Sequence, residues 1–260
     1  MQTPPSVPAG LRSNTVPVVT LIFWLIKMMS TTVGETGADY LNGALRFGLT
    51  ATSALAGLLF AVALWLQLRA GRYVPWRYWL TVVFISVFGT LITDNLTDQL
   101  GVPLAWSTAA FSVLLAAIFA VWHVKEGTLS ILAIDTPRRA LFYWAAILAT
   151  FALGTAAGDW VAEGLGWGYG KSALLFGALI GLTALARYAF RANAVACFWI
   201  AYVLTRPLGA SCGDLLSQPP GNGGLGLGTA AINLVFLGTI IALVAWLSVP
   251  DRRPALSGGG

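Results

Sequence analysis

Long apolar segments alternate with short polar ones along almost the whole chain. Each apolar segment is about 20 residues long, which is the length that an α-helix needs to cross the hydrocarbon core of a bilayer. The pattern predicts eight transmembrane helices at 16–38, 44–68, 77–97, 103–123, 139–161, 171–189, 193–214 and 226–248. The sequence therefore indicates an all-α, polytopic membrane protein.

Four of these segments carry the same motif, in which an aromatic residue and Trp are followed by nine residues, Gly, four residues and Asp. The copies align without gaps and read FWLIKMMSTTVGETGAD, YWLTVVFISVFGTLITD, YWAAILATFALGTAAGD and FWIAYVLTRPLGASCGD. The motif tryptophans, 55, 65 and 55 residues apart, are Trp24, Trp79, Trp144 and Trp199. Such regular internal repetition predicts four structural units in two halves offset by 120 residues.

Each unit is expected to contain one motif-bearing helix followed by one plainer helix. Two spans return the chain to the side of the membrane on which the unit began, so all four units are expected to run parallel. The chain then divides into a first half at 16–126, a second half at 127–249, and tails at 1–15 and 250–260. The arrangement predicts pseudo-symmetry about an axis along the membrane normal.

Basic residues gather at one end of the predicted helices. Only 10% of the residues are charged, whereas about a quarter are charged in a typical soluble domain. Of the 15 Lys and Arg residues, eleven lie at the termini or between units: Arg12, Arg69, Arg72, Arg77, Lys125, Arg138, Arg139, Arg187, Arg191, Arg252 and Arg253. The positive-inside rule therefore predicts that both termini are cytoplasmic. The net charge of +5 then reflects membrane topology, and we expect the lipid bilayer, not nucleic acid, as the partner.

Acidic residues gather at the opposite end. Seven of the ten lie in or just after the motifs: Glu35, Asp39, Asp94, Asp98, Asp159, Glu163 and Asp214. Asp94 follows Trp79 by 15 residues, or about 22 Å of helix, which places it in the outer third of the bilayer. A carboxylate at that depth normally faces a protein interior or a water-filled cavity. Four motif aspartates at equivalent positions therefore predict a site.

The expected site has an excess of negative charge. Its carboxylates are Glu35, Asp39, Asp94, Asp159 and Asp214, and its two cations are Lys27 and Arg206. Oxygen ligands suit a hard cation such as Mn²⁺, Mg²⁺ or Ca²⁺, or protons alone. The five carboxylates are the expected metal ligands, and Lys27 and Arg206 are the expected counter-charges. The hydroxyl groups expected to complete the coordination are those of Thr31, Thr32, Thr90 and Thr155. Apart from such a divalent cation, no cofactor is expected.

The motif glycines, Gly34, Gly89, Gly154 and Gly209, lie five residues before each motif Asp. Glycine permits a helix break that exposes carbonyl oxygens as ligands, or a close contact between two helices. Pro207 favours a kink or unwinding in the seventh helix. We expect helix breaks at these positions, with close packing as the alternative.

Two other interpretations compete with a functional site: a neutral structural network, and motif aspartates that only cap the next helix near the outer surface. Asp214 could pair with Arg206 and Glu35 with Lys27, giving a neutral structural network. The fourfold recurrence and the excess of acid favour a functional cavity instead.

The motif tryptophans lie close to basic loops. This placement is typical of an interfacial belt, and packing inside the bundle is the alternative.

The repeated motif resembles a bacterial family known only as a membrane-protein repeat of unknown function, whose members are usually labelled uncharacterised membrane-anchored proteins. The form FW..K...TT.GET..D in the first unit carries the resemblance most clearly, and all four units share it. The resemblance implies a bacterial inner-membrane protein with eight helices, and it supplies no activity.

The sequence contains no HExxH, Walker loop or CxxC pair, so we expect no enzymatic activity. The acidic site predicts a transporter of a small hard cation, Mn²⁺ or a similar divalent ion. Proton coupling is an option for this transporter, and efflux is the preferred direction. An exporter of organic cations and a non-transporting membrane scaffold are the alternatives.

Overall fold

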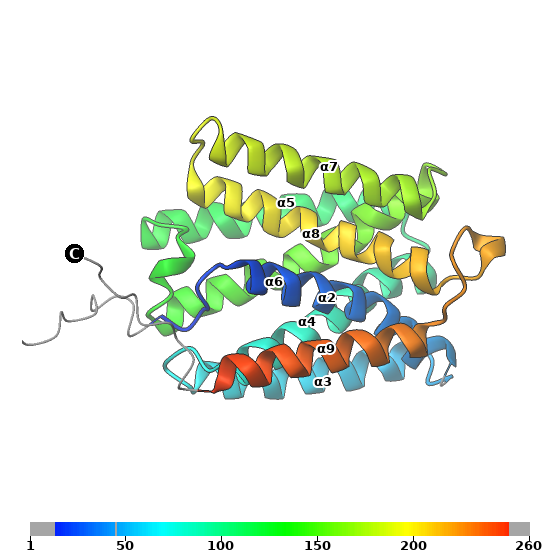
Figure 1. Ribbon diagram of the computed structural model, residues 1–260, viewed down its shortest axis with the longest axis horizontal. Helices are drawn as coiled ribbons and strands as arrows, with labels where there is room; N and C mark the ends of the chain where they lie inside the picture. Colours follow the sequence, from blue (N-terminus) through cyan, green and yellow to red (C-terminus); the bar gives the residue numbers. More distant parts are fainter. Residues whose placement is uncertain (1–13, 45, 250–260) are drawn as a thin grey trace, which may run out of the picture.

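The computed structural model describes residues 14–44 and 46–249, and over these residues it contains helices and no strand (Figure 1). Eight long helices confirm the all-α prediction: α2 Leu21–Asp39, α3 Leu49–Leu68, α4 Pro75–Asp94, α5 Leu104–Glu126, α6 Pro137–Asp159, α7 Tyr169–Tyr188, α8 Ala194–Ser217 and α9 Thr229–Ser248. The tails expected at 1–15 and 250–260 lie outside the described residues, apart from Asn14 and Thr15.

Two helices begin five residues later than the apolar pattern predicts. Helix α2 begins at Leu21 because the hydroxyl of Thr20 accepts a hydrogen bond from the backbone N–H of Phe23 and caps the first turn. Helix α3 begins at Leu49 because Gly48, with φ of 75°, turns the chain just before it. Caps and turns of this kind lie inside apolar segments, where the hydrophobic pattern does not reveal them.

Three motif helices continue into a short π-helical segment directly after the motif Asp. These segments are Tyr40–Ala44, Asn95–Gln99 and Trp160–Gly164. The fourth motif helix differs, because α8 stays α-helical through Asp214 to Ser217. Segments of π-helix are rare and often occur at functional sites. The motif aspartates therefore lie where the helix geometry changes in three units and not in the fourth.

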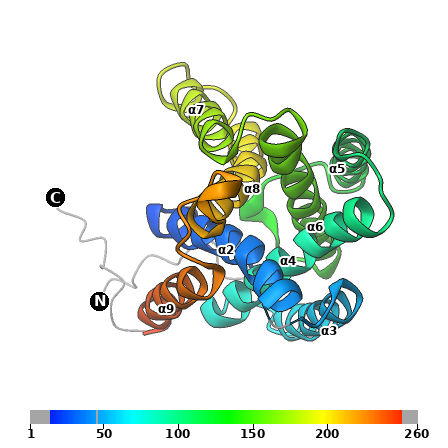
Figure 2. The same cartoon turned by 90° about the vertical axis from the view of Figure 1, so that its right-hand side faces the viewer.

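The motif helices form the inside of the bundle. They contact one another in a closed order, α2 to α4, α4 to α6, α6 to α8 and α8 to α2. Figure 2 shows α3, α5, α7 and α9 around them. Each outer helix packs mainly against the motif helix that follows it in the chain: α3 on α4, α5 on α6 and α7 on α8, while α9 returns to α2. The last helix of the chain thus completes the surroundings of the first.

Seven of the eight helices in the described part of the chain are long and apolar enough to cross a membrane. Helix α2, which contains Lys27 and Glu35, is the exception. The outer helices bury 17–28% of their apolar stretches inside the protein, whereas α4, α6 and α8 bury 50–67%. Exposed apolar side chains on the outer helices, such as Leu58, Val113 and Leu174, therefore face lipid.

The motif glycines and Pro207 lie inside continuous helices, so the expected helix breaks are wrong. Each glycine meets the next motif helix where a Cβ atom would collide with a neighbour. These contacts are Gly34 with Ser86, Gly89 with Phe151, Gly154 with Arg206, and Gly209 with Thr31. In every case the neighbour lies three residues before the glycine of its own helix. The glycines thus allow close helix packing in one repeated register, the alternative that the sequence left open.

Candidate functional site

Aromatic side chains close one end of the four motif helices. The residue before each motif Trp packs against the Trp of the next motif helix. Ring centroids are 5.6 Å apart for Phe23–Trp79, 5.5 Å for Tyr78–Trp144, 6.1 Å for Tyr143–Trp199 and 5.7 Å for Phe198–Trp24. We call these eight residues the aromatic layer. These contacts run from each motif helix to the next and return from the fourth to the first, as the glycine contacts do.

Most of the aromatic layer is inaccessible to solvent and lipid. Trp79, Trp144 and Trp199 are buried, so the prediction of an interfacial belt is wrong for these three. They pack inside the bundle because the aromatic residue of the preceding motif helix covers each of them. The hydroxyl groups of Tyr78 and Tyr143 form a hydrogen bond of 2.6 Å within the layer.

The guanidinium group of Arg206, on α8, reaches the other three motif helices. Its Nη1 donates to the carbonyl oxygen of Thr31 at 3.0 Å, and its Nη2 lies 3.0 Å from Oε2 of Glu35. Nη2 also contacts the hydroxyl oxygens of Thr90 and Thr155. Glu35, Thr90 and Thr155 are the residues directly after the motif glycines of α2, α4 and α6. Three equivalent positions of the repeat therefore converge on one cation.

This ion pair differs from the two pairs that the sequence suggested. Arg206 pairs with Glu35 and not with Asp214, which lies eight residues farther along α8, or about 12 Å. Lys27 and Glu35 are separated along α2 by the same distance. Among the described residues, no carboxylate lies within ion-pair distance of Lys27. The suggested neutral network of two pairs is therefore wrong.

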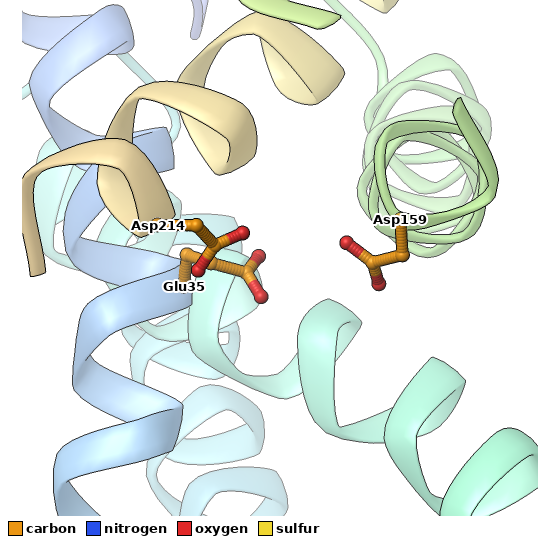
Figure 3. Close-up of side chains that lie close together, drawn as sticks. All are labelled: Glu35, Asp159 and Asp214. Atoms are coloured by element: carbon orange, nitrogen blue, oxygen red, sulfur yellow. The ribbon is translucent and has the colours of Figure 1, made fainter. Parts of the chain in front are cut away.

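Three of the five predicted carboxylates come together. Carboxylate oxygens of Glu35, Asp159 and Asp214 lie within 4.8 Å of one another, and we call these residues the acid triad. They project from α2, α6 and α8, and Figure 3 shows Asp159 directed toward the other two. Glu35 and Asp214 are buried, and Asp159 is half-buried. Since Ca²⁺ and Mg²⁺ bind oxygen at about 2.0–2.6 Å, one cation between these oxygens can contact all three after small movements of the side chains.

The remaining motif acids lie outside the acid triad. Asp39 ends α2, and its Oδ2 is 3.5 Å from the amide nitrogen of Gln218. Asp94 ends α4 and is half-buried. Farther along the chain, Asp98 and Glu163 are exposed. The acidic end of the motif helices is therefore in contact with solvent, whereas the opposite end is closed by the aromatic layer.

The four threonines predicted as ligands donate their hydroxyl groups to backbone carbonyl oxygens. The pairs are Thr31 with Met28, Thr32 with Gly209, Thr90 with Ser86, and Thr155 with Phe151. Thr32 thereby connects α2 to α8, while Thr90 and Thr155 turn their oxygen lone pairs toward Arg206. These contacts hold the motif helices together and orient the guanidinium group.

The charges of the site are ordered along the motif helices. Lys27 and Arg206 lie nearest the aromatic layer and have no exposed surface. Glu35 follows, and the motif aspartates lie beyond it toward the exposed end. Two buried positive charges thus lie toward the aromatic layer, and a larger number of negative charges lies toward the exposed end. Such an order favours the binding of cations near the acidic end.

Sequence reasoning missed the aromatic layer and the role of Phe151. A signal for the layer was available, because an aromatic residue precedes every motif Trp. The other units carry Thr31, Ser86 and Arg206 at the position of Phe151, so the motif gave no signal for an aromatic residue there. The ring centroid of Phe151 lies 5.3 Å from Nζ of Lys27 and 5.4 Å from Cζ of Arg206, so both buried cations contact the same ring.

The fold and the site together define a polytopic, helical membrane protein whose buried charges meet between its motif helices. The sequence model of one family, described as a Repeat of Unknown Function (DUF347), matches residues 22–73, 77–128, 142–193 and 197–253. These four segments cover most of the chain, which therefore belongs to this family, as the resemblance indicated. No curated protein and no solved structure matches the chain.

Proposed function

We propose that the protein transports a small hard cation, Mn²⁺ or a similar divalent ion, and that the acid triad binds it. The observation that carries the proposal is the approach of three carboxylates, from three different helices, to within 4.8 Å of one another. Carboxylates held together out of water need a cation, protons or a counter-charge to neutralise them. Hard divalent cations prefer oxygen ligands of this kind. The proposal assigns transport and no enzymatic reaction to the site.

The proposal includes four parallel two-helix units around an axis along the membrane normal. The glycine contacts support it, because each runs from one motif helix to the next in the same register, as from Gly34 to Ser86. The aromatic contacts support it as well, because they follow the same order and return from Phe198 to Trp24. Units related by rotation about one axis bring equivalent residues, such as Asp159 and Asp214, to the same depth.

The orientation in a bacterial inner membrane follows from the basic residues. Arg77 and Arg139 lie at the starts of α4 and α6, close in sequence to the aromatic layer. The acidic residues lie at the other ends of these helices. Under the positive-inside rule, the aromatic layer faces the cytoplasm, the acid triad faces outward, and both termini are cytoplasmic.

In this proposal Arg206 is the counter-charge that the cation replaces. A divalent ion on the acid triad uses Glu35 as a ligand and therefore competes with Arg206 for the same carboxylate. Arg206 keeps its contacts with Thr31, Thr90 and Thr155 when Glu35 turns to the ion. The empty and loaded sites thus differ in the partner of one carboxylate, and a ligand with unequal affinity for two states shifts their populations.

Uptake into liposomes tests the proposal. Reconstituted protein is assayed with Mn²⁺, Mg²⁺ and Ca²⁺, using an indicator trapped inside the vesicles. We expect the wild-type protein to move at least one of these ions. Asp159→Asn and Asp214→Asn should slow the uptake by about tenfold or more, because each removes a direct ligand.

Asp98→Asn is the matched control, since Asp98 is an exposed acid at the same end of the bundle and lies outside the acid triad. Its uptake rate should equal that of the wild type. Absence of uptake of all three ions by folded wild-type protein would contradict the proposal. Organic cations would then be tested in the same vesicles, and a lack of transport there would favour the scaffold.

A further inference from the structure

Lys27 is a buried cation that forms no ion pair within the described part of the chain. It lies on α2 with no exposed surface, and its Nζ donates to the carbonyl oxygen of Tyr202 at 3.1 Å and to the hydroxyl of Thr205. Nζ also lies 4.4 Å from the ring centroid of Tyr202 and 5.3 Å from that of Phe151. Two oxygen atoms and two aromatic faces are therefore its stabilising contacts.

The neighbouring helices supply little that could neutralise this charge. Helices α4, α8 and α9 pack against α2, and α9 carries no titratable side chain between Thr229 and Ser248. The inward titratable and charged groups of the other two helices are Tyr78 and Asp94 on α4, and Cys197, Tyr202, Arg206 and Asp214 on α8. Helix α6, which contacts Lys27 through Phe151, adds Tyr143 and Asp159. Of these groups, Arg206 is a second cation, and the three aspartates lie at the far end of their helices. A methionine would fill the space of Lys27 without the cost of a buried charge.

Hydroxyl groups lie between Lys27 and the basic end of the bundle. Tyr202 contacts Lys27 and is fully buried, and its hydroxyl has no hydrogen-bond partner within the described part of the chain. Tyr78 and Tyr143, which are hydrogen-bonded to each other, belong to the aromatic layer beyond it. The layer that closes this end therefore contains hydroxyl groups that can pass a proton.

We propose that Lys27 is the proton-carrying residue and that the protein exchanges its cation for a proton. The inference rests on the proposed function and adds the coupling ion to it. When a cation occupies the acid triad, Arg206 loses Glu35 and its charge is less compensated. Arg206 stays protonated at all times, whereas a buried lysine can become a neutral amine. Because Arg206 and Lys27 share the ring of Phe151, the increased repulsion acts on Lys27.

Lys27 releases one proton and takes up one proton in each cycle. As the cation binds, the ammonium group of Lys27 releases one proton by way of the tyrosine hydroxyls to water at the basic end, leaving a neutral amine. After the cation has left, the amine takes one proton from water at the acidic end. One proton crosses in each cycle from the acidic end to the basic end, and the cation moves the opposite way, from the basic end to the acidic end.

Vesicles with an imposed pH gradient test this role. Wild-type protein should accumulate Mn²⁺ against its own gradient while a pH-sensitive dye reports proton movement. Lys27→Met, which cannot carry a proton, and Lys27→Arg, which does not release one, should both lose this accumulation. Exchange of Mn²⁺ for labelled Mn²⁺ without a pH gradient should remain measurable in Lys27→Met, which carries no charge. The exchange should be slower in Lys27→Arg, whose permanent charge repels Arg206 throughout the cycle. Lys171→Met changes an exposed lysine on α7 and should alter neither process.

The outcomes separate this inference from the proposed function. Proton-driven accumulation that persists in Lys27→Met would overturn the role of Lys27 and leave cation transport standing. Loss of exchange as well as accumulation in both Lys27 variants would also overturn it, because Lys27 would then serve cation movement itself. Mn²⁺ uptake by the wild type that does not depend on the pH gradient would overturn the proposal that the cation is exchanged for a proton. Wild-type protein that moves no Mn²⁺ at all would overturn the proposed function, and this inference with it.

Discussion

Gly154 of α6 lies directly against the side chain of Arg206 of α8, with no space for a Cβ atom between them. The contact brings the guanidinium group to the hydroxyl of Thr155, the next residue of α6, at 2.7 Å. Gly34, Gly89 and Gly209 make the same kind of contact with the next motif helix. The motif glycine therefore does more than allow close helix packing, because its contact also determines where the guanidinium group of Arg206 lies.

Gly154→Ala should destabilise the protein, because the added methyl group must displace Arg206. Overpacking of this kind costs about 1–3 kcal/mol in the free energy of unfolding. Denaturant unfolding in detergent, followed by circular dichroism, measures the change. Gly181→Ala on α7, where nothing lies near the added Cβ, is the control and should be neutral or slightly stabilising. Equal stability of Gly154→Ala and the wild type would show that α6 and α8 are not in close contact.

A double-mutant cycle should reveal the pair between Arg206 and Glu35. Glu35→Gln leaves the buried guanidinium without its counter-charge, and Arg206→Met leaves the buried carboxylate without its partner. Breaking a buried ion pair from one side costs about 3–5 kcal/mol. The double variant should lose less stability than the sum of the two single losses, because it leaves neither charge unpaired. Additive losses would argue against direct contact.

The eight helices could be predicted because the length of an apolar segment is a local property of the chain. The starts of α2 and α3 could not, because they depend on Thr20 and Gly48 within apolar surroundings. The packing of α9 against α2 was equally hidden. It joins the two ends of the chain, and no pattern within one repeat unit specifies it.

The site was predicted in its composition but not in its pairings. The repeat placed Glu35, Asp159 and Asp214 among five acids at similar depth, but it did not show which three would meet. That selection depends on how each helix is rotated about its own axis. Arg206 pairs with Glu35 because both lie at the level of the motif glycines on adjacent helices, a relationship that appears only when the four units are superimposed around a common axis.

Labelling of single cysteines should establish which end of the bundle faces outward. In a Cys197→Ala/Cys212→Ala background, Asp98→Cys and Lys125→Cys each place one thiol at an exposed position at opposite ends of the helices. A membrane-impermeant maleimide added to intact bacterial cells should react with Asp98→Cys only. Lys125→Cys should react after the membrane is permeabilised. The reverse pattern would invert the proposed orientation and, with it, the direction of cation transport.

Binding of Mn²⁺ should stabilise the folded protein through the acid triad. A ligand that binds only the folded state adds about 2.7 kcal/mol when its concentration is 100 times its Kd. We expect Mn²⁺ to raise the unfolding temperature of the wild type, and a chelator to reverse the rise. Asp98→Asn should respond in the same way, because Asp98 lies outside the acid triad.

Asp214→Asn should lose this response without becoming less stable in the absence of metal. Asp214 lies beside Glu35 and Asp159, so replacing its carboxylate by an amide removes like-charge repulsion while keeping the volume of the side chain. Unchanged or higher stability without Mn²⁺, together with a lost response to Mn²⁺, is a combination that a folding defect does not produce. An equal response of Asp214→Asn and the wild type would mean that Mn²⁺ acts elsewhere, and that the acid triad is not the place where it binds.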